Sequence, residues 1–172
     1  MTYYSSTDLA NAFRTVRKNT LQVAHDLPAD KFDFRATPDT RTVAETLAHI
    51  AANTQWVHRV HGVDKVTSMS PEIFHKYFGE ANTYAATLTS REAILAALDH
   101  NGREFGDWLA TLTDATLAER VAFAPGTQPS HKTRFEMLLG VKEHEMHHRA
   151  QLMLIERMVG VVPHLTRARQ AR

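Results

Sequence analysis

The sequence predicts an all-α protein whose single domain is a four-helix bundle. Four long segments repeat apolar residues at steps of three and four, which is the period of a helix with one buried face. No segment of any length alternates apolar and polar residues as a half-buried strand does. A chain of 172 residues is also long enough for one domain with its own core. We expect the bundle over residues 1–165 and a basic, frayed tail over residues 166–172.

The first two predicted helices have clear end signals. The first runs over about residues 7–27, and Pro28 ends it. The second begins at Thr42, because Glu45 follows three residues later and completes a capping box. Its apolar stripe continues almost to Gly62, where we expect the helix to end.

The segment between the second and third long helices predicts only a short helix. Ser70-Pro71-Glu72 indicates a helix start, since proline fits the first helical turn, and we expect this helix to end at Phe78. The third long helix then starts at Thr89 or Ser90, and its apolar stripe continues as far as Leu109.

The last third of the chain contains a loop and the fourth long helix. The Pro125-Gly126 pair indicates a loop over residues 113–130. The helix begins at Thr133, where Glu136 completes another capping box, and we expect it to end near Val159.

Composition excludes several classes of protein and of site. A formal net charge of +1 gives no reason to expect a nucleic-acid or membrane-surface partner. The chain has no cysteine, so a metal would have to be held by nitrogen and oxygen atoms. The N-terminal residues lack the pattern of a signal peptide, and no apolar run is long enough to span a membrane. We therefore expect a cytoplasmic protein.

The most informative segment is Val141–Leu152, which places three histidines and a glutamate within five consecutive positions. His144 and His148 are four residues apart, so on a helix they point in nearly the same direction, about 40° apart around the axis. Their Cβ atoms would lie roughly 5–6 Å apart, so both imidazoles could reach one divalent ion. Both interrupt an apolar face, where two buried rings need partners. The pair therefore indicates a metal site.

A third ligand has to come from another helix, and His49 is the candidate. It stands on the second predicted helix among small residues such as Ala48 and Ala51, which would let another helix come close. His58 and His61 lie near the exit of that helix, and we interpret them as surface or helix-end residues. The other histidines show no paired spacing and have structural or solvated roles in this interpretation: His25, His75, His100, His131 and His164. His147 points away from the line of His144 and His148, so we expect it to form a hydrogen bond near the site and not to bind the metal. Three histidines with an open fourth position would form a site of catalytic type.

Three more residues of this segment are candidates for a role in catalysis. Glu145 follows His144 directly and so points about 100° away from it. We expect its side chain either to contact a metal ligand or to form a salt bridge at the surface. Arg149 and Gln151 are candidates for contacts with a substrate or with a ligand histidine. For Arg149, a role on the helix face is the favoured interpretation.

These segments together resemble the DinB/YfiT-like superfamily. The resemblance depends on DFRATP (33–38), TVAETLAH (42–49) and HEMHHRAQL (144–152), in an order and spacing that span nearly the full chain. In that family one histidine lies in the second helix, and two more, spaced H-x-x-x-H and usually followed by R-G-Q, lie in the last long helix. The departure here is Ala150, where glycine is usual, and it does not affect the ligands.

The resemblance implies a fold, a metal and a range of activities. It implies an up-down-down-up bundle, frequently a homodimer, with a divalent metal on three histidines that correspond to His49, His144 and His148. Members with a known activity include thiol-dependent transferases and isomerases that use mycothiol, bacillithiol or glutathione. We therefore expect zinc or nickel, with iron also compatible, and a low-molecular-weight thiol as a possible co-substrate.

Three functions follow as hypotheses. The first is a metal-dependent enzyme that acts on a small molecule, as a thiol-dependent S-transferase or a hydrolase. The alternative is a non-enzymatic, metal-stabilised dimeric bundle of the stress-response type. The third is a zincin-like metallopeptidase, because residues 144–148 match H-E-x-x-H, in which Glu145 would be the general base. We rank it lowest, since only the 24 residues 149–172 follow His148 and no strand pattern precedes it.

Overall fold

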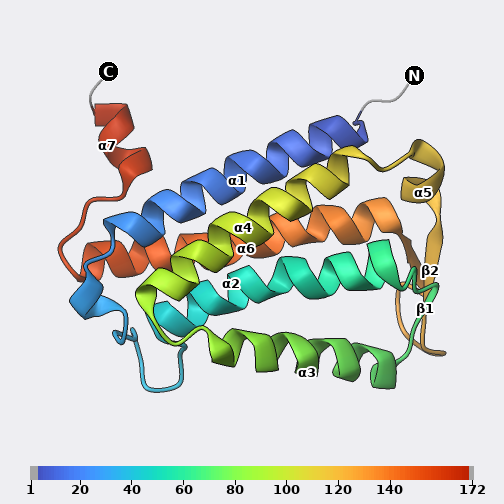
Figure 1. Cartoon of the computed structure of the whole chain (residues 1–172), viewed down its shortest axis with the longest axis horizontal. Helices are drawn as coiled ribbons and strands as arrows, with labels where there is room; N and C mark the ends of the chain where they lie inside the picture. Colours follow the sequence, from blue (N-terminus) through green and yellow to red (C-terminus); the bar gives the residue numbers. More distant parts are fainter. Residues whose placement is uncertain (1–3, 171–172) are drawn as a thin grey trace.

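The computed structural model describes residues 4–170, and four long helices in it form a bundle (Figure 1). These are α1 (Ser6–Asp26), α2 (Val43–His58), α4 (Arg91–Ala110) and α6 (Arg134–Met158). Helix α1 packs against α4 and α6, and α2 packs against the same two helices. The predicted all-α four-helix bundle is therefore confirmed. No helix in the described part of the chain combines the length and the apolarity needed to cross a bilayer.

The four helices run up, down, down and up. Helices α2 and α4 point the same way along the bundle, whereas α1 and α6 point the opposite way (Figure 1). Two parallel neighbours cannot be joined by a tight turn, so the chain has to return along the bundle between them. Helix α3 (Pro71–Thr87) makes this return and packs on the outside of α2.

The length of α3 corrects the short helix expected over residues 70–78. The helix continues to Thr87, because at about 1.5 Å of rise per residue a return past α2 needs about as many residues as α2 itself. Only Tyr77 and Ala81 of α3 are buried. The outer helix therefore has almost no apolar stripe, and its sequence gives a weak signal after Phe78.

Capping residues set the starts of the long helices. Thr42 caps α2 and Thr133 caps α6, and in both helices the side chain of the predicted glutamate bonds back to the backbone N–H of the cap. Ser90 caps α4. A further capping box at Ser5 and Asp8 starts α1. Each box satisfies backbone N–H groups that the first turn of a helix leaves unpaired.

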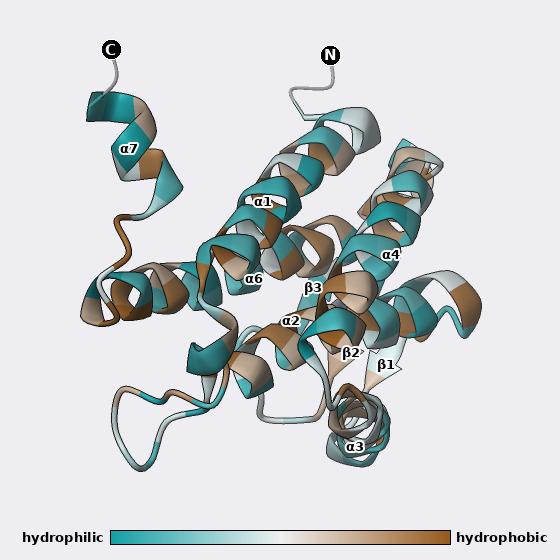
Figure 2. Ribbon diagram, turned by 60° about the vertical axis from the view of Figure 1, so that its left-hand side comes forward, coloured by the Kyte–Doolittle hydropathy of each residue, from teal (hydrophilic) through white to brown (hydrophobic). Residues whose placement is uncertain are grey.

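The core lies between the four helices, and α2 is its most enclosed element. Buried residues surround α2 on most of its circumference, as expected of a helix that packs against α3, α4 and α6 at once. Along α1 and α4, hydrophilic and hydrophobic residues alternate around the helix, as in amphipathic surface helices (Figure 2). Residues with at most 1% exposure in the cluster around α2 include Val23, Val43, Leu47, Ile50, Leu98 and Leu152.

A small sheet closes one end of the bundle and corrects the prediction of no strands. Strand β2 (Arg120–Phe123) pairs in parallel with β1 (Ser68–Met69) and antiparallel with β3 (His131–Thr133). Together with the short helix α5 (Asp114–Ala118), it occupies much of the expected loop over residues 113–130. Strands of two to four residues are too short to show alternation, and their pairing depends on segments far apart in the chain.

His61 lies at the end of α2, as one of the two alternatives predicted, but it is buried, which corrects the other alternative of a surface residue. It lies in a π-helical turn (Arg59–Val63) after α2 and is 4% exposed. Its Nδ1 atom is 2.9 Å from Nη1 of Arg134, which is itself 1% exposed and bonds Glu119 through Nε. Because a guanidinium only donates, His61 accepts and is neutral. Burial, and then the charge of Arg134, lower the pKa of His61 to about 4.

The basic tail forms a short helix, α7 (His164–Gln170), in place of the frayed segment that we expected. Arg167 contacts Asp26 at the end of α1, with 2.6 Å between Nη2 and Oδ2. Arg157 donates to the hydroxyl of Thr166 at 3.0 Å. These contacts hold α7 against the end of the bundle. Residues 171 and 172 lie outside the described part of the chain.

A buried ion pair links α6 to α1 and α4. Both oxygens of Glu145 accept hydrogen bonds from Arg17, each at 2.9 Å, and the two side chains are almost fully buried. Arg17 also donates to the carbonyl of Leu98 at 2.6 Å. A Cβ atom at Gly102 would lie only 2.6 Å from Nη1 of Arg17, so glycine makes room for the guanidinium.

Replacing Arg17 by alanine should destabilise the protein strongly. The change leaves the carboxylate of Glu145 buried without its partner, which costs about 3–5 kcal/mol. The matched control is Arg14→Ala on the same helix, because the ion pair of Arg14 with Asp107 is exposed. Such pairs contribute under about 1 kcal/mol. Urea unfolding of the two variants measures the difference, and equal losses would contradict a structural role for the buried pair.

Glu156 near the end of α6 is a buried carboxyl group without a partner. It is 0% exposed, and neither of its carboxylate oxygens has a hydrogen-bond partner among the described residues. Burial, and then the negative charge of Asp26, raise the pKa of Glu156 to about 7. Between pH 4.5 and 7 the folded protein therefore keeps a proton that the unfolded chain releases, so this group's contribution to stability falls as the pH rises.

Replacing Glu156 by glutamine should therefore stabilise the protein at pH 8 and have little effect at pH 4.5. The wild type has to bury a charge at the higher pH, which costs up to about 3 kcal/mol for a shift of this size. The measurement is the free energy of unfolding of both proteins from pH 4.5 to 8. A constant difference across this range would show that Glu156 does not titrate as its burial predicts.

Candidate metal centre

Three histidines converge between α2 and α6. Nε2 of His49, on α2, lies 3.0 Å from Nε2 of His144, on α6. Nε2 of His148, one turn further along α6, lies 3.1 Å from the same atom. The three residues each direct one nitrogen to a common point, and these nitrogens all lie within 4.8 Å of one another. The structure thus brings together the three residues named as metal ligands from the sequence.

The local packing explains why the rings meet. Helix α6 places His144 and His148 on the face that packs against α2, since residues four apart share one side of a helix. On α2, Ala48 is small and buried, and it lines the smaller side of the site together with Ala85 of α3. His148 is buried, and the other two histidines are partly buried.

The surroundings keep the three rings neutral. Burial lowers the pKa of His49 to about 3 and that of His144 to about 4, and it also lowers the pKa of His148. The positive charge of Arg41 lowers the pKa of all three in addition. Neutral imidazole is the form that binds a metal ion.

Gln151 selects the tautomer of His148. Its Oε1 atom lies 2.8 Å from Nδ1 of His148, and its Nε2 atom lies 3.1 Å from Nε2 of His147. An amide oxygen only accepts, so Nδ1 of His148 carries the proton and donates. The Nε2 atom of His148 therefore presents a lone pair to the cluster. Of the three catalytic candidates, Gln151 is the one that contacts a histidine of the cluster.

The donor set fits a divalent cation. Nε2 of His144 faces two other ring nitrogens at once, and a single ring proton cannot satisfy both contacts. A tetrahedral ion with bonds of 2.0–2.1 Å would hold its ligands about 3.3–3.4 Å apart, close to the observed separations. Nδ1 of His144 is buried without a hydrogen-bond partner among the described residues. Its ring therefore depends on the cluster for its contacts.

Glu145 and Arg149 face another part of the molecule. The carboxylate of Glu145 is bound by Arg17 of α1, as described above. Arg149 also faces α1, where Nη1 is 3.5 Å from the carbonyl of Val16. A zincin would need Glu145 beside the metal as a general base, so the ion pair contradicts the H-E-x-x-H hypothesis.

Two cavities adjoin the cluster, one on each side of the segment 39–41. The larger, of about 700 Å³, lies towards α6 and is lined by His147, His148, Gln151 and Leu154. The smaller, of about 460 Å³, lies towards α3 and is lined by His49, Asn82 and Ala85. Both cavities are also lined by Asp39, Thr40 and Arg41.

Arg41 was missed by sequence reasoning. It directly precedes the cap of α2 and has no helical spacing from any of the histidines, so no pattern points to it. The fold places it at the cluster because the segment before α2 lines cavities together with His49 of α2 and His148 of α6. Only the observed cavities and its charge at the three rings reveal its position.

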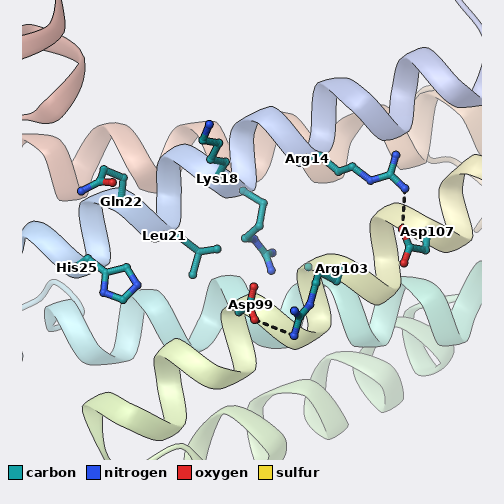
Figure 3. Close-up of a pocket in the computed structure, with 10 residues that line it drawn as sticks. Arg14, Lys18, Leu21, Gln22, His25, Asp99, Arg103 and Asp107 are labelled. Carbon is teal, nitrogen blue, oxygen red and sulfur yellow. Dashed lines mark hydrogen bonds and ion pairs between the residues drawn. The ribbon is translucent and has the colours of Figure 1, made fainter.

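A third cavity, of about 430 Å³, lies between α1 and α4 and has different chemistry (Figure 3). Arg14 pairs there with Asp107, and Arg103 pairs with Asp99 (Figure 3). Two of its cations thus pair with its own acids, and Arg17 pairs with the buried Glu145. None of the three clustered histidines lines this cavity, so we place the functional site at the other two.

Fold and site together define a class of four-helix bundles in which three histidines from two helices converge on one point. The sequence profile of the DinB superfamily matches residues 12–152. The chain therefore belongs to the DinB superfamily, as its motifs predicted. No curated protein matches the chain.

Two solved structures share the fold at low sequence identity. YfiT from Bacillus subtilis, described as a probable metal-dependent hydrolase with an unusual four-helix bundle topology, is 16% identical, with a TM-score of 0.66. That match covers 94% of this chain and 91% of YfiT. An uncharacterized protein from Clostridium difficile 630 is also 16% identical, with a TM-score of 0.69, and the match covers 92% of this chain and 99% of the other.

Replacing Gln151 by leucine should weaken metal binding about 10–100-fold, because the hydrogen bond that orients a ligand histidine is lost. The control is Gln151→Glu, which keeps an oxygen that accepts from Nδ1 of His148 and should keep the affinity. Competition with a chelating dye measures the affinity for zinc in each protein. An equal loss of zinc affinity in both variants would show that metal binding does not depend on the oxygen of residue 151 that accepts from His148.

Proposed function

We propose that this protein is a metal-dependent enzyme acting on a small molecule, with His49, His144 and His148 as the ligands of a divalent cation. The observation that carries the proposal is the convergence of three neutral imidazoles at a point bordered by two cavities. Three protein ligands leave a coordination position free for a substrate atom. Zinc and nickel are the favoured ions, and iron also suits imidazole ligands.

The residues around the cluster have distinct tasks in this proposal. A cation bound there supplies Lewis acidity, which favours the deprotonated form of a thiol or of water. Gln151 holds His148 in the tautomer that binds metal. The ion pair of Arg17 with Glu145 holds α6 from its other side, so that His144 and His148 face α2. The cavities provide space for the small molecule.

The presence of two cavities favours a reaction of two substrates. One cavity reaches His49 and the other reaches His148, so two molecules could approach the cluster from different sides. A thiol-dependent S-transferase needs such an arrangement, with a low-molecular-weight thiol on one side and an electrophile on the other. A hydrolase, the activity in the description of YfiT, needs only one organic substrate and is the second candidate.

The non-enzymatic alternative is a metal-stabilised dimeric bundle. A structural zinc site is usually closed by four protein ligands. Among residues 4–170, the group that could hold a metal contains three. A homodimer is compatible with either function, and the exposed apolar side chains of Met146, Leu154 and Met158 along α6 support it.

The wild-type protein should carry about one equivalent of metal after gentle purification. The variants His49→Ala, His144→Ala and His148→Ala should each lose this metal, because two imidazoles bind a divalent ion less tightly than three. The control is His147→Ala, which removes an exposed histidine of the same segment that lies outside the cluster. Elemental analysis of the five proteins is the measurement. A His49→Ala protein that keeps its metal would contradict the ligand set across two helices.

Activity assays on the metal-loaded protein then distinguish an S-transferase from a hydrolase. Low-molecular-weight thiols with a chromogenic aryl halide test S-transfer, and nitrophenyl esters without a thiol test hydrolysis. S-transfer that is lost in the three histidine variants would support the transferase. Ester cleavage without thiol would support the hydrolase, and metal binding without either reaction would favour the non-enzymatic bundle.

A further inference from the structure

Arg41 is the one arginine that lines both cavities at the histidine cluster. It is exposed, and it forms no ion pair or hydrogen bond with any residue in the described range 4–170. It lines the smaller cavity together with His49 and the larger cavity together with His148, and its positive charge lowers the pKa of all three rings. A guanidinium beside a metal-binding cluster, open to two cavities, is available to a ligand.

The acidic residues of these cavities are engaged elsewhere. Glu45 accepts from the backbone N–H of Thr42 at 2.7 Å and lies 3.8 Å from Arg35. Asp39 accepts from the hydroxyl of Thr37 at 2.6 Å. Neither carboxylate lies within ion-pair distance of Arg41, so the N–H donors of its guanidinium stay available to a ligand.

Charge balance then indicates the kind of molecule that fits. Imidazole binds a metal ion in its neutral form, so a divalent cation at the cluster would keep its full charge, and Arg41 would add another positive charge nearby. No carboxylate belongs to the cluster. A substrate with a metal-binding donor atom and an oxyanion group would satisfy both charges, since a guanidinium offers paired N–H donors that match a carboxylate.

We propose that Arg41 binds the carboxylate or a similar oxyanion of the small-molecule substrate or thiol co-substrate whose donor atom lies at the histidine cluster. This inference rests on the proposed metal-dependent function and names the substrate class of the same site. Arg41 is thereby a specificity-determining residue, which selects anionic over neutral molecules.

Simple thiols test the proposal on the cobalt(II)-loaded protein, whose visible spectrum changes when a thiol binds the metal. The probes are mercaptoacetate and 3-mercaptopropionate, which carry a carboxylate at two distances from sulfur, and neutral 2-mercaptoethanol. The quantity measured is the preference for an anionic thiol, given by the Kd of the neutral thiol divided by the Kd of each anionic thiol. We expect this ratio to fall about three- to tenfold in Arg41→Gln for at least one anionic probe, because one charge-assisted contact is lost.

Two further variants make the test specific. Arg35→Gln removes the same charge from the smaller cavity, but Arg35 faces Glu45, so its ratio should equal that of the wild type. Arg41→Lys keeps the charge without the planar fork and should keep part of the preference. The cobalt spectrum before addition of thiol shows whether each variant retains the folded site.

The outcomes separate this inference from the function on which it rests. A wild-type protein that binds no cobalt overturns both. Cobalt binding with a ratio that is the same in wild type and Arg41→Gln overturns the role of Arg41 and leaves the metal site standing. An equal fall in Arg35→Gln would show that general positive charge, and not Arg41, attracts the anion.

Discussion

The rotation of α6 about its axis is the constraint on which the site depends. His144 and Glu145 are adjacent and therefore point about 100° apart on the helix. The ion pair with Arg17 holds Glu145 against α1 and α4, and this leaves His144 and His148 facing α2. Breaking the ion pair between Arg17 and Glu145 would let α6 rotate and would move His144 and His148 away from α2. The stability of the bundle and the geometry of the histidine cluster are thus linked through one turn of α6.

The parallel course of α2 and α4 has a second consequence for the site. Because the chain has to return between them, α3 lies outside α2 and forms a wall of the smaller cavity through Asn82 and Ala85. The segment before α2 forms the wall that both cavities share. The topology thus supplies the cavities, whereas the helices of the bundle supply the histidines. In the proposed function, substrate selection and metal binding would therefore reside in different parts of the fold.

Buried polar groups occur at both ends of the bundle as well as at its centre. Near the sheet, the charged Arg134 pairs with Glu119 and donates to the neutral ring of His61. Among residues 4–170, Glu156 near α7 has no hydrogen-bond partner, and the fold is more stable when this group is protonated than when it is charged. The protein therefore tolerates polar groups in its core where they are neutral or paired, and the histidine cluster follows the same rule, because its rings are neutral.

The sequence by itself determined the four helices of the bundle and the pairing of His144 and His148 on one face of α6. Apolar periodicity and the capping boxes at Thr42 and Thr133 are local signals, and the spacing of His144 and His148 acts within one helix turn. The length of α3, the short sheet, the burial of His61 and the position of Arg41 were decided only by tertiary structure. Each depends on contacts between segments far apart in the chain, for which no periodic pattern exists. Local spacing can predict which side chains share a face, but only the packing of the helices decides what that face meets.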